Sequence, residues 1–335
     1  MTRAASFLLV SCLWASAAAE EGPVRVIKGV AIANGRAMQQ FGGSPSVGER
    51  FSEMANAYAA HLGPQVKVYS IVVPTAISFY LPGGPKPTPE RAAILAGKAK
   101  LGPGVTFVDA YAEIERHTAE NLYFRSDTHW TVRAAYYTYV AFCAAAGFRA
   151  VPLSAMERGV HPNFKGYLYG YTKDPSLLTI PDEVEYFMPT VPYEASLMSG
   201  PPEYATARPG TFVEPKAGNY VTFLGGDHAL LVGRTRVDTR RRALVIKNSY
   251  GNPFAPFLLP HFEQVLVVDY RYFEGRIDEL VRKYQVTDVL LINPTLTAYA
   301  KWHLDRTWRI LDHAVPRSAP ATAAPAPKKR RHRRR

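Results

Sequence analysis

The chain has 335 residues, of which 47% are hydrophobic and 12% aromatic, so it can bury a substantial core and global disorder is excluded. The formal net charge is +12, but more than half of it comes from the final run KKRRHRRR. This run has no interleaved aromatic residues, so we expect no nucleic-acid partner. A basic tail of this kind is suited to contact with anionic polymers of the cell envelope.

The first residues are typical of a secretory signal peptide. Arg3 precedes an apolar run, and the run Ala17 to Ala19 fits the small-residue cleavage pattern. We predict a signal peptide over residues 1–19 and a periplasmic or secreted protein. A lipoprotein anchor at Cys12 is the alternative, although the apolar run before it is short. After cleavage Cys143 would be the remaining cysteine, which excludes an internal disulfide.

Short apolar runs alternate with helical patterns along the chain. The runs predict strands at residues 66–73, 105–108, 243–247, 264–268 and 288–292. The amphipathic patterns predict helices at residues 88–101, 110–121, 131–146 and 276–285. Strands that alternate with helices imply parallel pairing, so the sequence predicts an α/β sandwich.

The middle and the end of the chain differ in composition from this pattern. We expect one α/β domain over residues 24–315, with an insertion at about 150–240 that is dense in Pro, Gly and Tyr. Such a segment predicts short strands and loops that carry a substrate-facing surface. Residues 316–335 are a Pro/Ala linker followed by the basic tail, a composition typical of disorder.

An acid and a histidine stand two residues apart just before the helix predicted at 131–146. In an extended segment Asp127 and His129 point to the same side, so the carboxylate can orient the imidazole, as a Ser-His-Asp triad requires. The alternative is that Asp127 or Thr131 caps the helix and His129 packs on Trp130.

A serine follows the strand predicted at 243–247. Ser249 precedes Gly251 and Asn252, and a helix is expected after them. A serine at a sharp turn after a strand is exposed at the carboxyl edge of the sheet, which is the arrangement of a nucleophile elbow. An ordinary turn is the alternative, because Ser-Tyr-Gly-Asn is good turn composition.

Together, DTHWT and KNSYGNPFAPFLLPHFEQVLVVDYRYF resemble the bacterial DHHW family and the related proteins of alginate O-acetylation. The resemblance implies an SGNH-hydrolase-like three-layer α/β/α sandwich with permuted motif order, in which the Asp-x-His block precedes the serine block. It makes Ser249 the nucleophile, His129 the base and Asp127 the residue that orients His129. Thr128 replaces the second histidine of the family motif, and Asn248 stands where relatives often have Asp.

Further residues are candidates for the oxyanion or the substrate. Asn293 follows a predicted strand at a position where SGNH-like proteins often place an oxyanion donor, with a turn before Pro294 as the alternative. Arg271 either binds an anionic sugar or holds a loop. Tyr250, next to the serine, is a third candidate. For His228 we expect a structural hydrogen bond.

A metal site is the rival interpretation, with Asp127 and His129 as ligands and His228 or His117 as a third. The chain lacks H-x-x-x-H and paired-Cys spacings, and a metal site leaves Ser249 without a role. We therefore predict no metal and no cofactor.

The sequence thus predicts an exported serine-dependent O-acetyltransferase acting on a polysaccharide. Its partners would be the polymer and an acetyl donor, with a membrane acyl-transfer protein as a possible source of the acetyl group. An acetylesterase with the same triad is one alternative, because the two outcomes differ only in whether water is excluded. A polysaccharide-binding pseudoenzyme with a vestigial triad is the other.

Overall fold

The structure is a computed structural model that describes residues 22–199 and 206–311. The predicted signal peptide (1–19), the alternative anchor Cys12, and the predicted linker and basic tail (316–335) lie outside the described residues. Within the described ranges, no helix combines the length and the apolar character needed to cross a bilayer.

An eight-stranded sheet organises the described part of the chain, in the order β5-β4-β13-β11-β12-β10-β8-β9. The first five strands in this order pair in parallel. They are β4 (Lys67–Val73), β5 (Val105–Val108), β11 (Arg242–Lys247), β12 (Gln264–Asp269) and β13 (Asp288–Pro294). These bounds lie within two residues of the predicted runs, so the strand predictions and the parallel pairing are confirmed.

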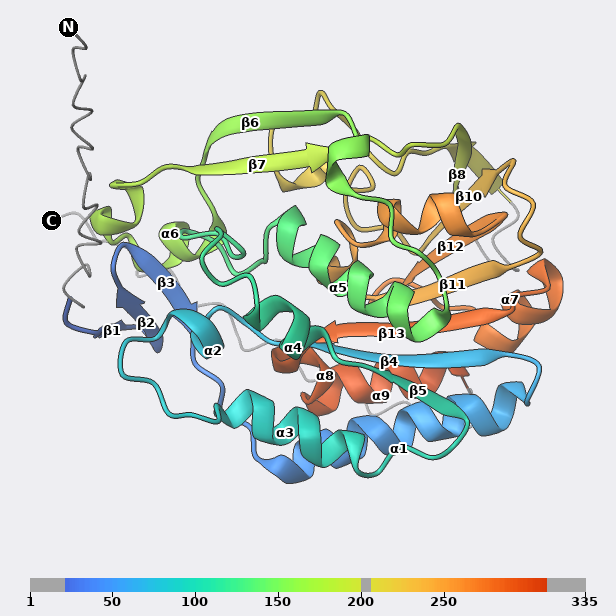
Figure 1. The fold of residues 1–335 in the computed structure, drawn as a ribbon, viewed down its shortest axis with the longest axis horizontal. Helices are drawn as coiled ribbons and strands as arrows, with labels where there is room; N and C mark the ends of the chain where they lie inside the picture. The colour runs from blue at the N-terminus through green and yellow to red at the C-terminus, as the bar shows by residue number, and fades with distance from the viewer. Residues whose placement is uncertain (1–21, 200–205, 312–335) are drawn as a thin grey trace, which may run out of the picture.

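Helices cover both faces of this sheet, as Figure 1 shows. On one face lie α1 (Pro45–Leu62), α3 (Pro89–Lys98), α7 (Ile277–Tyr284) and α9 (Lys301–Leu311). On the other lies α5 (Val132–Ala146). Successive strand residues serve opposite faces: Val245 packs toward α5, and Leu244 and Ile246 pack toward the other layer. This is the predicted three-layer α/β/α sandwich.

The middle of the chain contains short strands joined by loops and short helical turns. Its strands β6 (Arg158–Phe164) and β7 (Asp182–Phe187) form a separate antiparallel ribbon. However, β8 (Tyr193–Ser199), β9 (Thr206–Pro209) and β10 (Leu230–Thr235) extend the main sheet with antiparallel pairing. Because β10 lies between β12 and β8, it is an interior strand, and its Leu230 and Leu231 are buried on opposite faces of the sheet.

The N-terminal region forms a small sheet that the sequence patterns did not predict. It contains β1 (Arg25–Ile27), β2 (Val30–Ala33) and β3 (Arg36–Gln39) in antiparallel order. Its apolar side packs against Leu168 of α6 (Tyr167–Thr172) and Leu177 of the 3₁₀ turn η2 (Pro175–Leu178). This sheet supports the segment that carries Asp127.

Two predicted helices differ from the structure. The helix predicted at 110–121 ends early, as α4 (Ala110–Glu115), and the chain turns so that His117 stacks on Tyr137 with ring centroids 3.5 Å apart. The helix expected after Ser249 is replaced by two 3₁₀ segments, η4 (Ser249–Gly251) and η5 (Ala255–His261). Pro256 and Pro260 explain this difference, because proline lacks the N–H that a continuous α-helix needs.

Candidate active site

Ser249 lies at the carboxyl edge of the parallel strands. It begins η4 immediately after β11 and Asn248, whose side-chain oxygen accepts a hydrogen bond from the Tyr250 amide at 3.0 Å. A Cβ on Gly251 would approach the Lys247 Cβ to 2.4 Å, so only glycine lets the turn fold back so closely on the strand. The sharp turn after the strand is thus specified locally.

Asp127 and His129 lie in a bend rather than in the extended segment that we expected. An isolated antiparallel bridge between Tyr123 and Trp130 closes the loop that contains them. Within the bend, the His129 amide donates to Asp127 Oδ1 at 3.0 Å, which is the hydrogen bond of an Asx turn. This bond, rather than strand alternation, brings the imidazole back onto the carboxylate.

The structure brings the three predicted triad side chains together. His129 Nε2 lies 2.8 Å from Ser249 Oγ, and His129 Nδ1 lies 2.6 Å from Asp127 Oδ1. The capping alternative does not describe these residues: Thr131 occupies the N-cap position of α5 without a side-chain capping bond, and its hydroxyl donates to the Asn121 carbonyl. The continuous Ser–His–Asp contact is the geometry that nucleophilic acyl transfer requires.

Asp127 is held in its ionised form. Burial alone would raise its pKa, but hydrogen bonding and charge attraction from His129, together with backbone N–H donors, lower the pKa below the usual value of 3.8. The Tyr167 amide donates to Asp127 Oδ2 at 2.6 Å, so both carboxylate oxygens are occupied. An ionised, immobile carboxylate fixes the orientation of the imidazole.

Distant parts of the chain hold the Asp–His loop in place. The buried Asp182 accepts from the amides of Arg125 and Ser126 at 2.8 and 2.7 Å, and the Ala37 amide of β3 donates to the Arg125 carbonyl at 2.8 Å. At Gly166 a Cβ would lie 2.2 Å from the Asp127 Cβ, so a glycine is required there too. The loop therefore depends on long-range contacts.

Tyr220 contacts both halves of the site, although no sequence pattern predicted it. Its ring stacks on His129 with centroids 4.2 Å apart, and its hydroxyl donates to the Ser249 carbonyl at 3.1 Å. Burial raises the pKa of this phenol well above its usual value, so it stays protonated and remains a donor. It lies in η3 (Tyr220–Thr222), and no local motif marks it.

The oxyanion and substrate candidates lie at the same sheet edge but differ in their surroundings. Asn293 is 2% exposed near the end of β13, which contacts η4, and its Oδ1 has no hydrogen-bond partner among the described residues. Tyr250 is buried at 4% exposure, and its hydroxyl donates to the Thr128 carbonyl. The Tyr250 side chain therefore packs beneath His129 and is not placed to contact a substrate.

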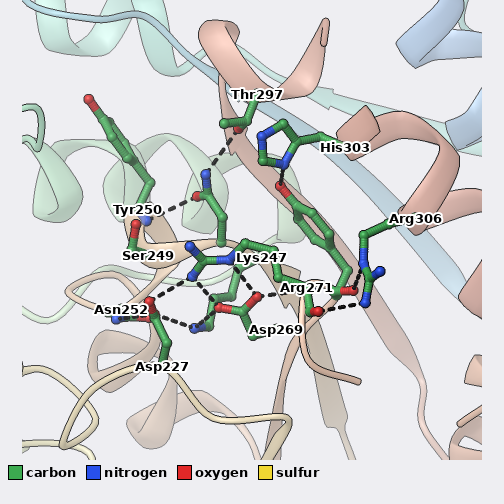
Figure 2. A network of polar contacts seen from close by, with 12 residues as sticks. Asp227, Lys247, Ser249, Tyr250, Asn252, Asp269, Arg271, Thr297, His303 and Arg306 are labelled. Atoms are coloured by element: carbon green, nitrogen blue, oxygen red, sulfur yellow. Dashed lines mark hydrogen bonds and ion pairs between the residues drawn. The ribbon is translucent and has the colours of Figure 1, made fainter. Parts of the chain in front are cut away.

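Arg271 holds a loop rather than facing solvent as a free cation. Figure 2 shows its guanidinium beside Asp269 and Asp227, together with Lys247. The Arg271 Nη2 atom lies 2.6 Å from Asp269 Oδ2 and 2.7 Å from Asp227 Oδ2. Lys247 Nζ lies 3.0 Å from Asp269 and 3.3 Å from Asp227. Two cations and two carboxylates thus balance one another next to the serine turn, where Asn252 donates to Asp227. These contacts agree with the interpretation that Arg271 holds a loop.

The histidines proposed as third metal ligands do not join Asp127 and His129. In residues 22–199 and 206–311, no group of three or more His, Cys, Asp or Glu side chains is arranged to hold a metal ion. Burial and the nearby Lys247 lower the pKa of His228, and its buried Nε2 has no hydrogen-bond partner within the described chain. His117 stacks on α5 instead.

Comparison with known families agrees with the motifs around this site. A family model described as DHHW protein matches residues 13–268. The chain belongs to the DHHW family. Both the Asp–His loop and the serine turn of this DHHW protein fall inside the matched region. Among curated proteins no significant match was found.

Solved structures with the same fold include another DHHW protein. A DHHW family protein from Eubacterium siraeum is 28% identical with a TM-score of 0.78, and the match covers 87% of this chain and 98% of that one. Bacillus cereus PatB1, solved with a sulfonyl adduct, is 16% identical with a TM-score of 0.67, covering 88% and 99%. The O-acetyltransferase domain of Pseudomonas putida AlgJ is 15% identical with a TM-score of 0.47, covering 86% and 99%. The first two of these structures share the three-layer α/β/α fold of this chain.

Proposed function

We propose that this DHHW protein is an exported serine-dependent O-acetyltransferase that acts on a polysaccharide. The observation that carries the proposal is the unbroken contact from Ser249 Oγ through His129 to Asp127. A vestigial triad in a binding protein would be under no constraint to keep both short contacts, so this geometry favours an enzyme over a pseudoenzyme.

In the proposed first step, Ser249 Oγ attacks the carbonyl carbon of an acetyl donor while His129 Nε2 takes the hydroxyl proton. Asp127 stabilises the imidazolium that forms, and His129 returns the proton to the leaving group. The Ser249 amide and the Asn293 side chain are the proposed donors to the oxyanion, since both belong to the edge where β11 and β13 end. The product is an acetyl ester on Ser249.

In the second step a sugar hydroxyl gives its proton to His129 and attacks the acetyl carbon. The ester bond to Ser249 breaks, and His129 returns the proton to Ser249 Oγ. Water in place of the sugar would give hydrolysis. The motif resemblance to proteins of alginate O-acetylation favours transfer to a sugar.

The test uses p-nitrophenyl acetate and a sulfonyl fluoride, which modifies activated nucleophiles. We expect a burst of nitrophenol, an acetyl mass on the peptide that contains Ser249, and loss of turnover after sulfonylation of Ser249. Ser249→Ala should abolish all three, while Ser46→Ala, an exposed serine on α1, should change none. Undiminished turnover in Ser249→Ala would exclude a serine mechanism.

Transfer and hydrolysis are separated by adding polysaccharide acceptors to the acetyl-enzyme. An acceptor that takes up acetyl groups faster than acetate is released supports the transferase, and release of acetate alone identifies an esterase. Export is tested separately, by sequencing the N-terminus of the protein from cell fractions. We expect a mature chain that begins at Glu20, and an intact Met1 in the cytoplasm would contradict export.

A further inference from the structure

The surface beside Asp127 carries a pair of exposed aromatic rings. Tyr167 and Tyr171 of α6 are 62% and 40% exposed, and their rings lie 5.9 Å apart with planes only 15° from parallel. Single exposed aromatic residues are common on proteins, but two adjacent parallel rings leave an apolar ledge that water solvates poorly. Such a ledge suits a ligand with a flat apolar face and a polar edge.

The pair is rigidly attached to the candidate active site. The Tyr167 amide donates directly to Asp127 Oδ2 at 2.6 Å, the Tyr169 amide donates to the Ser126 carbonyl at 2.9 Å, and the Gly166 amide donates to Ser126 Oγ at 3.0 Å. Leu168 of α6 is buried against residues of the β1–β3 sheet, and Figure 1 shows this sheet beside α6. Only Asp127 and His129 separate the Tyr167 backbone from the Ser249 hydroxyl.

One exposed cation lies against the pair of rings, and two more lie at the ends of the same helix. Lys28 Nζ lies 5.2 Å from the centroid of the Tyr171 ring and donates to the Tyr171 carbonyl, while Lys165 and Lys173 are exposed at either end of α6. The nearest acid along the chain, Asp174, is buried and paired with Arg25. The ledge therefore has a positive border that attracts anionic groups.

We propose that Tyr167 and Tyr171 form the acceptor subsite of the enzyme and bind a polysaccharide that contains acidic sugars. The apolar C–H face of a pyranose ring packs on an aromatic ring, and carboxylates on the same chain pair with the lysines. This inference rests on the proposed function and adds the place and the chemical class of the acceptor.

Binding is tested without any acetyl donor, so the result does not depend on the triad. The probes are a polyuronate oligosaccharide and a neutral β-glucan oligosaccharide of equal length, titrated into the full chain by calorimetry. We expect binding of the polyuronate that weakens as salt rises. Tyr167→Ala and Tyr171→Ala should each raise its Kd about tenfold. Tyr167→Phe should stay near the wild type, because the ring remains.

The matched control is Trp302→Ala, since Trp302 is 48% exposed on α9 in the opposite layer. It should bind as the wild type does. Turnover of p-nitrophenyl acetate, which has no sugar, should remain within about twofold in Tyr171→Ala, while acetyl transfer to the polyuronate falls with binding. Polyuronate binding that is unchanged in the double alanine variant, absent in the wild type, or weaker than β-glucan binding would overturn the inference.

The two hypotheses fail in different ways. If Ser249→Ala keeps its turnover while the tyrosine variants lose polyuronate binding, the serine mechanism is wrong and the sugar subsite stands. If Ser249→Ala is inactive and the tyrosine variants bind normally, the enzyme stands and the subsite is wrong.

Discussion

The two halves of the candidate active site are built in different ways. Ser249 follows directly from β11, and its turn is fixed by neighbours in sequence such as Asn248 and Gly251. The Asp–His loop has no regular structure of its own and is held by Asp182, by β3 and by α6. Ser249 is thus positioned by local geometry, while Asp127 and His129 depend on segments 40 or more residues away in the chain.

The charge beneath the two halves differs as well. Below Ser249, Lys247 and Arg271 face Asp227 and Asp269, so a buried charge network stiffens the ends of β11 and β12. The Asp–His loop instead relies on backbone N–H groups that point at the carboxylates of Asp127 and Asp182. Disruption of the first should reduce stability, and disruption of the second should reduce activity as well as stability.

The largest effect is expected where the two halves meet. Ser249→Ala and His129→Ala should each lower kcat on acetyl esters by about 10⁴-fold or more, and the double variant should be little worse because the residues act as a unit. Asp127→Asn should be milder but still costly, since the imidazole can then adopt the wrong tautomer. Steady-state kinetics measure this, and additive losses in the double variant would show that the two side chains act separately.

Asp182→Asn should damage the loop half alone. The asparagine side chain has one acceptor oxygen, so it cannot accept from the amides of both Arg125 and Ser126 as the Asp182 carboxylate does. We therefore expect a loss of about 1–3 kcal/mol in unfolding free energy. We also expect a roughly 10- to 100-fold loss of kcat as Asp127 is displaced. Urea unfolding and kinetics measure the two effects, with the exposed neighbour Glu183→Gln as control. Normal kcat in a destabilised Asp182→Asn would mean that the loop does not depend on Asp182 for its catalytic geometry.

Asp227→Asn should affect the serine half through pH-dependent stability. Burial opposes ionisation of Asp227, but Lys247, Arg271 and Asn252 lower its pKa to about 2. A carboxyl whose folded pKa lies below the unfolded value stabilises the fold above that unfolded value, and the stabilisation is lost as pH falls from about 4 toward 2. We expect the substitution to reduce the unfolding free energy by about 2 kcal/mol at pH 6.

The difference between wild type and Asp227→Asn should shrink by pH 3, as measured by urea unfolding at both pH values. The exposed Asp238→Asn serves as control and should show no such trend. A difference that stays constant from pH 6 to pH 3 would contradict a depressed pKa at Asp227.

The smallest effect is expected for the residue that links the halves. Tyr220→Phe keeps the ring on His129 and loses the hydrogen bond to the Ser249 carbonyl, which is worth about 0.5–1.5 kcal/mol. We expect kcat to fall a few fold with KM unchanged, and Tyr220→Leu to fall further. The exposed Tyr272→Phe is the control. Equal activity of Tyr220→Phe and Tyr220→Leu would mean that stacking on His129 has no role.

The sequence by itself determined the parallel strands and the position of Ser249 after β11. A continuous apolar run of strand length is typical of a parallel strand that is buried on both faces, so these runs predicted the central strands. The Ser-Tyr-Gly-Asn turn after β11 is specified by the residues adjacent to it. The motif resemblance added the pairing of Ser249 with the Asp–His block, 120 residues earlier in the chain.

Only the tertiary structure decided the remaining features. Asp127 and His129 meet through an Asx turn in a bend. A bend has no regular spacing of apolar residues, so its geometry could not be predicted from the sequence pattern. Arg271 is paired because two carboxylates from different segments converge on it, and Tyr220 reaches His129 from a 3₁₀ turn in the middle of the chain. The physical reason is the same in each case: local patterns report which face of an element is buried, whereas contacts between loops depend on how the packed layers bring distant segments together.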